Sequence, residues 1–358
     1  MPPGRPFRAL ALALAAASAA AFAPSPAGDP GKALQIPGLG GAAYLAGSGV
    51  NVAGGSLTFQ HNSGVSVVSA CSGSWQPQDI AQFKLLGKSI SFMVDLSKVG
   101  CACNLAFYLV SAPARDPQGN PIPGSNNLAP GNFYCDANKV GGQWCPEVDI
   151  MEANNHAFQA TPHKCDRPTN GHYANCDRGG CAQNTRDLPK AYGPGAGNKI
   201  DTTKPFKVTT TFTAQGATLT GMITRLEQNG QSVTLDHSNC QASYLAELSK
   251  AMSDGMSLRM TYWGDAADTM SWMDSPPCGG ETCNGANAGA GVISNIAITA
   301  HGGGGGAPPP APGPAPVTVP LPPVPTTSLP YDCKAGLQDW RRIWSPAKKR
   351  WCCQHTGG

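Results

Sequence analysis

Apolar and polar residues alternate along much of this chain, and the pattern predicts a protein built mostly of β-strands. Residues 89–96 (SISFMVDL) and 206–213 (FKVTTTFT) repeat with a period of two, as expected for a strand with one buried face. Only residues 242–252 (ASYLAELSKAM) have helical spacing. Four further segments have strand character: residues 104–112, 217–227, 256–263 and 291–299. The short turn AQG before the second of these predicts a hairpin. Many strands with little helix indicate an all-β fold, a β-sandwich or jelly roll with long loops.

The first 23 residues resemble a secretory signal peptide. Arg5 and Arg8 form a basic flank, Ala9–Ala21 is a short apolar run, and small residues follow it. The run is shorter than the roughly 20 apolar residues that a bilayer requires, and no later segment is apolar enough to span one. We therefore expect a secreted, extracellular protein that has no contact with a membrane once the signal is cleaved.

Composition divides the rest of the chain into three parts. Residues 31–301 fit a single all-β domain. Residues 302–330 are rich in glycine and then in proline, which predicts a linker. Residues 331–358 form a Cys- and Trp-rich tail that is too small to fold without covalent staples.

Cysteine usage supports an oxidising compartment. The chain has 14 cysteines without the repeated CxxC spacing of zinc sites, so disulfides are the better interpretation. Eleven cysteines precede residue 302 and three follow it. Both counts are odd, so either each part keeps a free thiol or one bridge joins the two parts.

Charge is sparse and nearly balanced. Charged residues make up 13% of the chain, and the formal net charge is +3. This distribution argues against a nucleic-acid partner. A neutral polymer such as a polysaccharide suits this surface, and we expect a monomer.

Three carboxylates are concentrated in one predicted strand, although only 22 of the 358 residues are acidic. Glu147 and Asp149 would face the same side, whereas the odd offset of Glu152 would bury it in a regular strand. A one-residue β-bulge near residues 150–151 would return Glu152 to the carboxylate face. The two glutamate carboxyls would then lie about 5 Å apart, as in a retaining glycosidase. An acidic surface turn is the alternative interpretation.

Crowding predicts unequal protonation of these acids. Like charges this close cannot all ionise normally, so at least one pKa should be raised. We expect Asp149 to donate or accept a hydrogen bond with Glu147 and so to tune it.

The stretch EVDIMEAN, residues 147–154, resembles the E-x-D-x-x-E-A-N signature of glycoside hydrolase family 7, the cellobiohydrolases and endoglucanases that act on cellulose. The segments FYCDAN and TPHKC, AYGPG followed by DTTKPFKVTTTF, and the strand pair in residues 83–112 are also similar to that family. The resemblance covers about residues 80–300 in collinear order. It implies a concanavalin-like β-sandwich that needs neither metal nor organic cofactor.

The resemblance also implies roles for individual residues. Glu147 matches the nucleophile, Glu152 the general acid/base, Asp149 the assisting carboxylate and His163 the histidine near the acid/base. By itself His163 would be interpreted as structural. The matching substrate contacts are Asn104, Tyr108, Tyr134, Asp136, Asn138, Arg186, Trp263 and Trp272. Without the family, packing in the core is an equal alternative for the two tryptophans.

Departures from the family pattern indicate an open cleft. The aromatic platform of the family's N-terminal region has no counterpart before residue 40, and the segment between Tyr134 and Glu147 is short. Ala267 stands where the family often has tyrosine, and Met151 where it has tryptophan. Short loops predict internal, endo-type cleavage rather than processive release of cellobiose.

Two functions remain open on these grounds. The leading hypothesis is a secreted retaining β-1,4-glucanase with a β-glucan substrate. The alternative is a non-catalytic polysaccharide-binding or wall-structural protein on the same fold. The tail has three tryptophans that could stack on glucan, but its three cysteines do not fit the fungal cellulose-binding pattern. A tail that binds nothing, or binds another protein, is therefore equally compatible.

Overall fold

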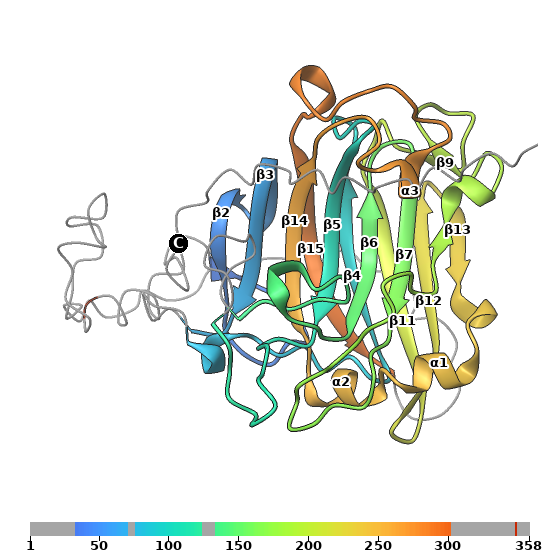
Figure 1. Cartoon of the computed structure of the whole chain (residues 1–358). Coiled ribbons are helices and arrows are strands. Elements are labelled where there is room, and N and C mark those ends of the chain that lie inside the picture. The colour runs from blue at the N-terminus through green and yellow to red at the C-terminus, as the bar shows by residue number, and fades with distance from the viewer. Residues whose placement is uncertain (1–32, 71–75, 124–132, 302–347, 349–358) are drawn as a thin grey trace, which may run out of the picture.

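The computed structural model describes residues 33–70, 76–123, 133–301 and 348. The predicted signal peptide and linker lie outside the described residues, as does the predicted tail apart from Lys348. The regular secondary structure of the described part is almost entirely β-strand, and the strands are arranged in two packed layers (Figure 1). This confirms the predicted all-β sandwich.

Thirteen strands form one antiparallel sheet in the order β13-β12-β11-β4-β15-β3-β14-β5-β6-β7-β8, with β2 beside β3 and β1 beside β2. The strands of this sheet are β1 (Ala33–Leu34), β2 (Ala43–Ala53), β3 (Ser56–Val68), β4 (Lys88–Asp95), β5 (Cys103–Val110), β6 (Glu147–Ala153), β7 (Phe158–His163), β8 (Gln183–Asn184), β11 (Phe206–Gln215), β12 (Thr218–Gln228), β13 (Gln231–Asp236), β14 (Ser257–Gly264) and β15 (Gly291–Ala300). The parallel pair β9 (Tyr192–Gly193) and β10 (Ile200–Asp201) stands apart from it.

The long sheet becomes a sandwich because β3 belongs to both layers. The first half of β3 pairs with β15 through residues 56–59, and its second half pairs with β14 through residues 63–66. The sheet therefore folds over at β3, which places β14, β5, β6 and β7 against β15, β4, β11 and β12 (Figure 1). The outer face of the first layer carries the chemistry described below.

The predicted strands of residues 89–96, 104–112, 206–213, 217–227, 256–263 and 291–299 correspond to β4, β5, β11, β12, β14 and β15. The predicted hairpin is confirmed by the antiparallel pairing of β11 with β12. The predicted helix is divided into α1 (Ala242–Ala246) and α2 (Ser249–Asp254). A tight turn in which the N–H of Leu248 donates to the carbonyl of Leu245 separates the two.

The strands β2 and β3 were not predicted, because glycine and serine interrupt their apolar pattern. Gly47 of β2 has a φ of 142°, and a Cβ there would lie 2.1 Å from the carbonyl oxygen of Gly64 on β3. Close approach of the two backbones thus requires glycine at this point. The pairing also shifts register just after it, between Ser48 and Val50.

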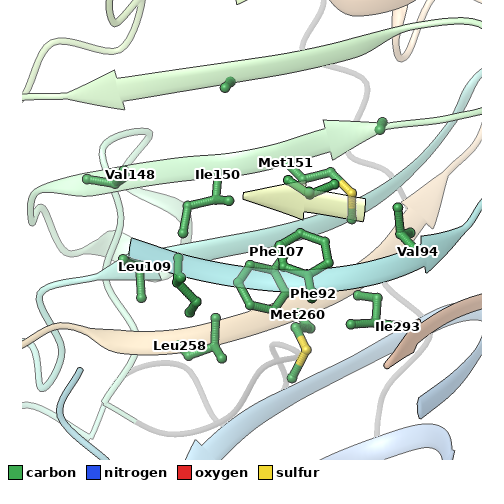
Figure 2. Close-up of a cluster of buried hydrophobic side chains, with 14 of the residues drawn as sticks. Phe92, Val94, Phe107, Leu109, Val148, Ile150, Met151, Leu258, Met260 and Ile293 are labelled. Atoms are coloured by element: carbon green, nitrogen blue, oxygen red, sulfur yellow. The ribbon is translucent and has the colours of Figure 1, made fainter. Parts of the chain in front are cut away.

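The core lies between the two layers and is mostly apolar (Figure 2). The buried hydroxyls of Thr210 and Thr224 hydrogen-bond each other at 2.8 Å. Phe92 of β4 stacks on Phe107 of β5 with ring centroids 4.2 Å apart, which joins the layers directly. Val148, Ile150 and Met151 of β6 enter the same core. Inward residues of β6 therefore anchor the strand whose outward residues are the carboxylates.

Helices are few and short. Beyond α1 and α2 there is α3 (Ser271–Asp274), and single 3-10 turns occur at Pro77–Asp79, Val140–Gly142, Thr185–Asp187, His237–Asn239 and Gly285–Asn287. Within the described ranges, no helix reaches the length and apolar character needed to cross a membrane.

Five disulfides staple the loops. The pairs are Cys101–Cys278, Cys103–Cys283, Cys135–Cys145, Cys165–Cys176 and Cys181–Cys240. Every cysteine in the described residues is paired, which confirms the disulfide interpretation. Cys71 and the three tail cysteines lie outside the described residues, so a bridge between body and tail stays a prediction.

Candidate active site

A β-bulge in β6 brings the three carboxylates to one face, as predicted. Next to β5, Met151 pairs with Phe107 and Asp149 with Tyr108, so Ile150 is an extra residue without a partner position. The register with β7 shifts across the same residues. Because Ile150 and Met151 both point into the core, Glu152 returns to the side of Glu147 and Asp149.

The carboxylates form the floor of a pocket of about 760 Å³. Glu147 and Asp149 are buried, whereas Glu152 retains some solvent exposure. Around them the pocket is lined by predicted site residues: Tyr108, Tyr134, Asp136, Asn138, His163, Arg186, Trp263 and Trp272. Predicted site residues separated by up to 164 positions in the sequence, from Tyr108 to Trp272, thus meet at one place.

Asp149 is paired with His163, not with Glu147. Nε2 of His163 lies 3.0 Å from Oδ2 of Asp149. β7 runs beside β6 and presents this imidazole to Asp149, so the expected hydrogen bond to Glu147 is not seen between these described side chains. The expected tuning is present, because the charge of Asp149 raises the pKa of Glu147. Nδ1 of His163 lies 2.9 Å from the carbonyl oxygen of Asp177, so Nδ1 carries a proton and donates it.

His163 is held in its charged form. Burial alone would lower its pKa, but the hydrogen bond and charge of Asp149 outweigh burial and raise the pKa to about 9. Gly180 makes room for the ring, since a Cβ there would lie 2.7 Å from both Cε1 and Nδ1 of His163. At neutral pH Asp149 and His163 thus form an ion pair inside the pocket.

Both glutamates have raised pKa values. Burial is the main cause for Glu147, and the charges of Asp149 and Asp136 add to it. The N–H of Ala137 donates to Oε2 of Glu147 at 3.0 Å and favours the ionised form. Burial, followed by the charge of Asp149, raises the pKa of Glu152 to about 8. The predicted crowding effect is present, and the pair holds at least one proton near neutral pH.

Two tyrosines and an acid form a wall beside Glu147. The hydroxyls of Tyr108 and Tyr134 lie 3.1 Å apart, and burial raises the pKa of each. Oδ1 of Asp136 accepts the N–H groups of Asn138 and Val140, each at 2.9 Å. Asp136 thus shapes the loop that borders the pocket, while burial raises its own pKa.

Comparison with known proteins places this arrangement in a family. Residues 137–244 match the model of glycosyl hydrolase family 7. Endoglucanase EG-1 of Trichoderma longibrachiatum is 31% identical over 300 residues, covering 72% of this chain and 61% of that protein. The chain belongs to glycosyl hydrolase family 7. It spans about three fifths of the length of this relative.

Other family members agree. The probable endo-beta-1,4-glucanase celB of Aspergillus flavus is 28% identical over 272 residues, covering 63% of this chain and 64% of that one. The native structure of Humicola insolens endocellulase EGI superposes with a TM-score of 0.56 at 23% identity, covering 71% and 78% of the two chains. A family 7 cellobiohydrolase from Daphnia pulex gives 0.53 at 21% identity, covering 70% and 79%. At these identities the two structures establish a shared fold.

One predicted substrate contact of the family 7 site lies elsewhere. Asn104 is fully buried and does not line the pocket. Its amide donates to Oε1 of Glu152 at 3.0 Å, and its side-chain oxygen accepts the N–H of Ala153 at 3.0 Å. Asn104 therefore holds Glu152 from beneath instead of facing the pocket.

The two tryptophans are surface residues. Trp263 and Trp272 are 41% and 40% exposed, so they do not pack in the core. Nε1 of Trp272 donates to the carbonyl oxygen of Thr269 at 3.1 Å, which fixes the indole on the short helix α3. Flat apolar faces at a pocket edge suit the faces of pyranose rings.

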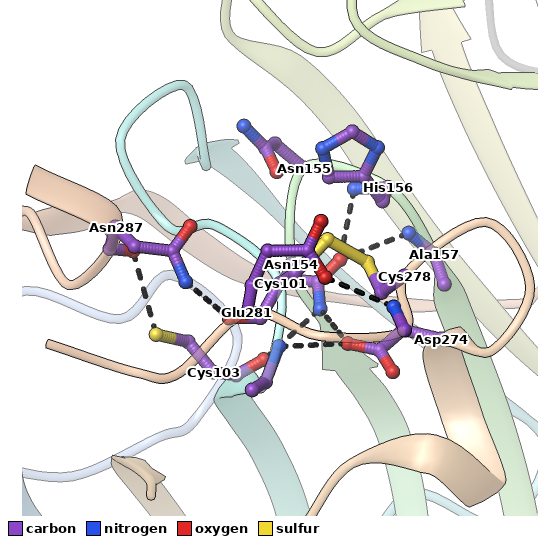
Figure 3. The surroundings of a disulfide bond; sticks show 12 residues. Cys101, Cys103, Asn154, Asn155, His156, Ala157, Asp274, Cys278, Glu281 and Asn287 are labelled. Atoms are coloured by element: carbon purple, nitrogen blue, oxygen red, sulfur yellow. Dashed lines mark hydrogen bonds between the residues drawn. A yellow bond between two sulfur atoms is a disulfide. The ribbon is translucent and has the colours of Figure 1, made fainter. Parts of the chain in front are cut away.

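Asn154, the last residue of the carboxylate motif, is structural. Its Nδ2 donates to Oδ2 of Asp274 at 2.8 Å and to the carbonyl oxygen of Cys103 at 3.1 Å. Its Oδ1 accepts the N–H groups of His156 and Ala157 in the turn between β6 and β7 (Figure 3). Because Asp274 ends α3, Asn154 links the carboxylate strand to the helix that carries Trp272.

Several pocket residues were missed in the sequence. Gln159 and Thr161 precede His163 by four and two positions on β7 and share its face. The two-residue period could have revealed both once His163 was chosen. Arg178 also lines the pocket, but it comes from an irregular loop in which no period applies.

A metal is not required to explain this cluster. Glu147, Asp149 and His163 each place one ligand-type atom within 4.8 Å of the others. However, Nε2 of His163 already faces Asp149, so a cation would have to break that ion pair. Chemistry without metal or organic cofactor stays a prediction.

Proposed function

We propose that this protein is a retaining endo-type β-1,4-glucanase that hydrolyses cellulose or a related β-glucan. The bulge at Ile150 carries the proposal, because it turns Glu147 and Glu152 toward one pocket while leaving them with different partners. Burial raises the pKa of both glutamates, that of Glu152 to about 8, so the pair keeps a proton at neutral pH. Oε2 of Glu147 accepts the N–H of Ala137, which favours the ionised form of Glu147. A retaining glycosidase needs this division between a nucleophile and an acid.

In the proposed mechanism two displacements occur at the anomeric carbon. Glu152 donates its proton to the glycosidic oxygen while an oxygen of Glu147 attacks the anomeric carbon and forms a covalent glycosyl-enzyme. Glu152, now ionised, then removes a proton from water, and the water oxygen replaces Glu147. The product keeps the β-configuration because the centre is inverted twice.

Asp149 and His163 support this cycle. The charge of Asp149 raises the pKa of Glu152 and helps to keep its proton, whereas the charge of His163 lowers this pKa and partly offsets Asp149. His163 is fixed in turn by the carbonyl of Asp177. Loss of either partner would therefore disturb the protonation of the acid as well as its position.

The proposal extends to the substrate and the cellular context. Exposed Trp263 and Trp272 would stack on sugar rings, with the pocket residues Tyr108, Tyr134, Asp136, Asn138 and Arg186 as polar contacts. We include secretion through residues 1–23, a linker at 302–330, a separate tail at 331–358 and a monomeric state. These parts rest on the sequence patterns described above.

The test is hydrolysis of a soluble β-glucan by the wild type and by Glu147→Gln. We expect the variant to lose at least about 10³-fold in kcat, since it cannot form the covalent intermediate. Proton NMR of the first product should show the β-anomer. Glu227→Gln is a matched control, because Glu227 lies on β12 outside the pocket.

The alternative, a non-catalytic polysaccharide-binding or wall-structural protein, predicts another outcome. Wild type and Glu147→Gln would then bind β-glucan equally and release equal, negligible reducing sugar. An α-anomeric first product would overturn the retaining mechanism while leaving glycoside hydrolysis intact.

A further inference from the structure

A cationic cluster lies beside the pocket at the Glu147 end of β6. It consists of Lys139, Trp144 and Arg178, called here the cationic wall. Nζ of Lys139 lies 5.6 Å from the centroid of the Trp144 ring, and Cζ of Arg178 lies 5.7 Å from it. Arg178 itself lines the pocket, as do Asn138 and Val140 on either side of Lys139.

The cationic wall joins two loops that approach from different parts of the chain. Nη2 of Arg178 donates to the carbonyl oxygen of Asn138 at 2.8 Å. This contact links the loop after β7 to the loop before β6. The guanidinium has five N–H donors, and this bond uses one of them.

The loop that carries Lys139 is held rigidly. The disulfide Cys135–Cys145 closes it, and Oδ1 of Asp136 binds two of its backbone N–H groups. Lys139 has a φ of 60°, a left-handed conformation that is uncommon for residues other than glycine. Lys139 is thus presented by a fixed turn.

The loop that carries Arg178 is also pinned. Disulfides at Cys176 and Cys181 hold it on both sides. The neighbouring acid, Asp177, is already engaged, because its Oδ1 accepts the N–H of Gly179 and its Oδ2 accepts the hydroxyl proton of Tyr244.

Neither cation is neutralised by an acid. Among the described residues, the ion pairs involve His163, Arg186, Lys204, Arg225 and Lys250, but not Lys139 or Arg178. Both side chains are exposed. Two positive charges at a pocket edge therefore remain available to a ligand.

The opposite edge of the pocket has different chemistry. Trp263 lies on the far end of β14, level with Asn104 and beyond Glu152, and Trp272 is on α3. Exposed indoles recognise the apolar faces of neutral sugars, and they need no cation to do so. Binding an unsubstituted glucan does not require two unneutralised charges beside Glu147.

We propose that the cationic wall binds an anionic substituent of the polysaccharide, a carboxylate or a sulfate ester, so that the preferred substrate is an acidic β-glucan. The inference deepens the proposed function and rests on it for the sugar backbone. The guanidinium of Arg178 offers paired N–H donors that match an oxyanion, and Lys139 adds a second charge. Trp144 orients both cations before the ligand arrives.

The test measures binding separately from hydrolysis. The full chain carrying Glu147→Gln is run by affinity electrophoresis in gels that contain carboxymethyl cellulose or neutral hydroxyethyl cellulose of similar chain length. The same measurement is made after adding Lys139→Gln and Arg178→Gln. The control adds Lys199→Gln and Lys207→Gln, which remove two exposed charges that do not line the pocket.

We expect the ratio of anionic to neutral affinity to fall about three- to tenfold in the cationic-wall variant and to stay unchanged in the control. The difference should shrink at 0.5 M salt, because exposed charges are screened. An unchanged ratio in the cationic-wall variant would overturn the inference. An equal loss of both affinities would also overturn it, since it would mean that the cations only stiffen the loops.

Hydrolysis of the two polymers by the wild type separates this inference from the proposed function. If the binding ratio depends on Lys139 and Arg178 but neither polymer is cleaved, the glucanase proposal fails and the anionic site stands. If both polymers are cleaved but the binding ratio is insensitive to the two substitutions, the glucanase proposal stands and the anionic site fails.

Discussion

At the scale of single residues, the chemistry of the pocket depends on which of its side chains carry a proton. Glu152 keeps a proton because it is largely removed from water and lies near Asp149, while His163 keeps one because Asp149 faces it. Asp149 and Glu152 carry the same carboxyl group, but Asp149 faces an imidazole and Glu152 faces the amide of Asn104. Their neighbours, and not their own chemistry, decide which can act as an acid.

These shifts predict a stability that falls as pH rises. Folding raises the pKa of Glu152 from 4.5 to about 8 and that of His163 from 6.5 to about 9, so the folded state binds more protons between pH 4.5 and 9. The His163 contribution is complete below pH 6.5 and is lost as pH rises through 9. The cost of ionising Glu152 grows as pH rises from 4.5 to 8.

Glu152→Gln should therefore reduce the pH dependence. Between pH 5 and 8 we expect the change in the free energy of unfolding, measured by urea titration, to be about 2 kcal/mol smaller in the variant than in the wild type. The value is discounted because Glu152 is partly exposed. Glu227→Gln serves as the control, since it lies on β12 far from the cluster. Equal slopes for wild type and Glu152→Gln would contradict the raised pKa.

At the scale of elements, the bulge in β6 and the turn that follows it position the site. Ile150 absorbs one residue and turns Glu152 outward. Asn154 then closes the turn to β7 and ties it to the end of α3 through Asp274. One strand and its turn thus hold the carboxylates in a fixed position relative to α3, the helix that carries Trp272.

Asn154→Asp tests this link. The substitution would replace the donor to Asp274 by a second carboxylate, and two buried like charges at this distance are strongly unfavourable. We expect a loss of about 3 kcal/mol in the free energy of unfolding at pH 7, with partial recovery at pH 4, measured by urea titration. The control is Asn170→Asp, because Asn170 is exposed. Similar losses in both variants would show that the Asn154–Asp274 contact has no special role.

At the scale of the whole molecule, one layer of the sandwich separates the pocket from the core. The pocket lies on the outer face of this layer, and the core lies against its inner face. β14, β5, β6 and β7 carry apolar residues inward (Figure 2). Their outward residues line the pocket. Five disulfides then fix the loops that border the pocket. Beside Glu147 the pocket is bordered by the short segment between Tyr134 and Glu147 and by the loop that carries Arg178.

A short border of this kind predicts endo-type cleavage. An accessible pocket lets the enzyme bind within a chain, so the viscosity of a soluble cellulose derivative should fall much faster than cellobiose accumulates. Viscometry and chromatography of the same reaction measure the two quantities. Cellobiose as nearly the sole product from the start would contradict internal cleavage.

The sequence by itself determined the strands with a regular apolar period and the outward carboxylates, because a period of two fixes which side chains share a face. It also indicated the bulge, since the odd spacing of Glu147 and Glu152 is otherwise incompatible with a common face. It did not determine β2 and β3, whose apolar pattern is interrupted. The spacing could not identify partners on other strands. Asp149 pairs with His163, and Asn104 supports Glu152 from below, because separate strands lie side by side in the sheet.

The tertiary structure alone decided the contacts between loops. Lys139, Trp144 and Arg178 occur in irregular segments without a period. Disulfides and the side-chain hydrogen bonds of Arg178 and Asp136 hold these segments together. The pairing of ten cysteines has the same origin. Local pattern governs the elements because their geometry repeats, whereas contacts between distant loops depend on how the whole sheet folds over at β3.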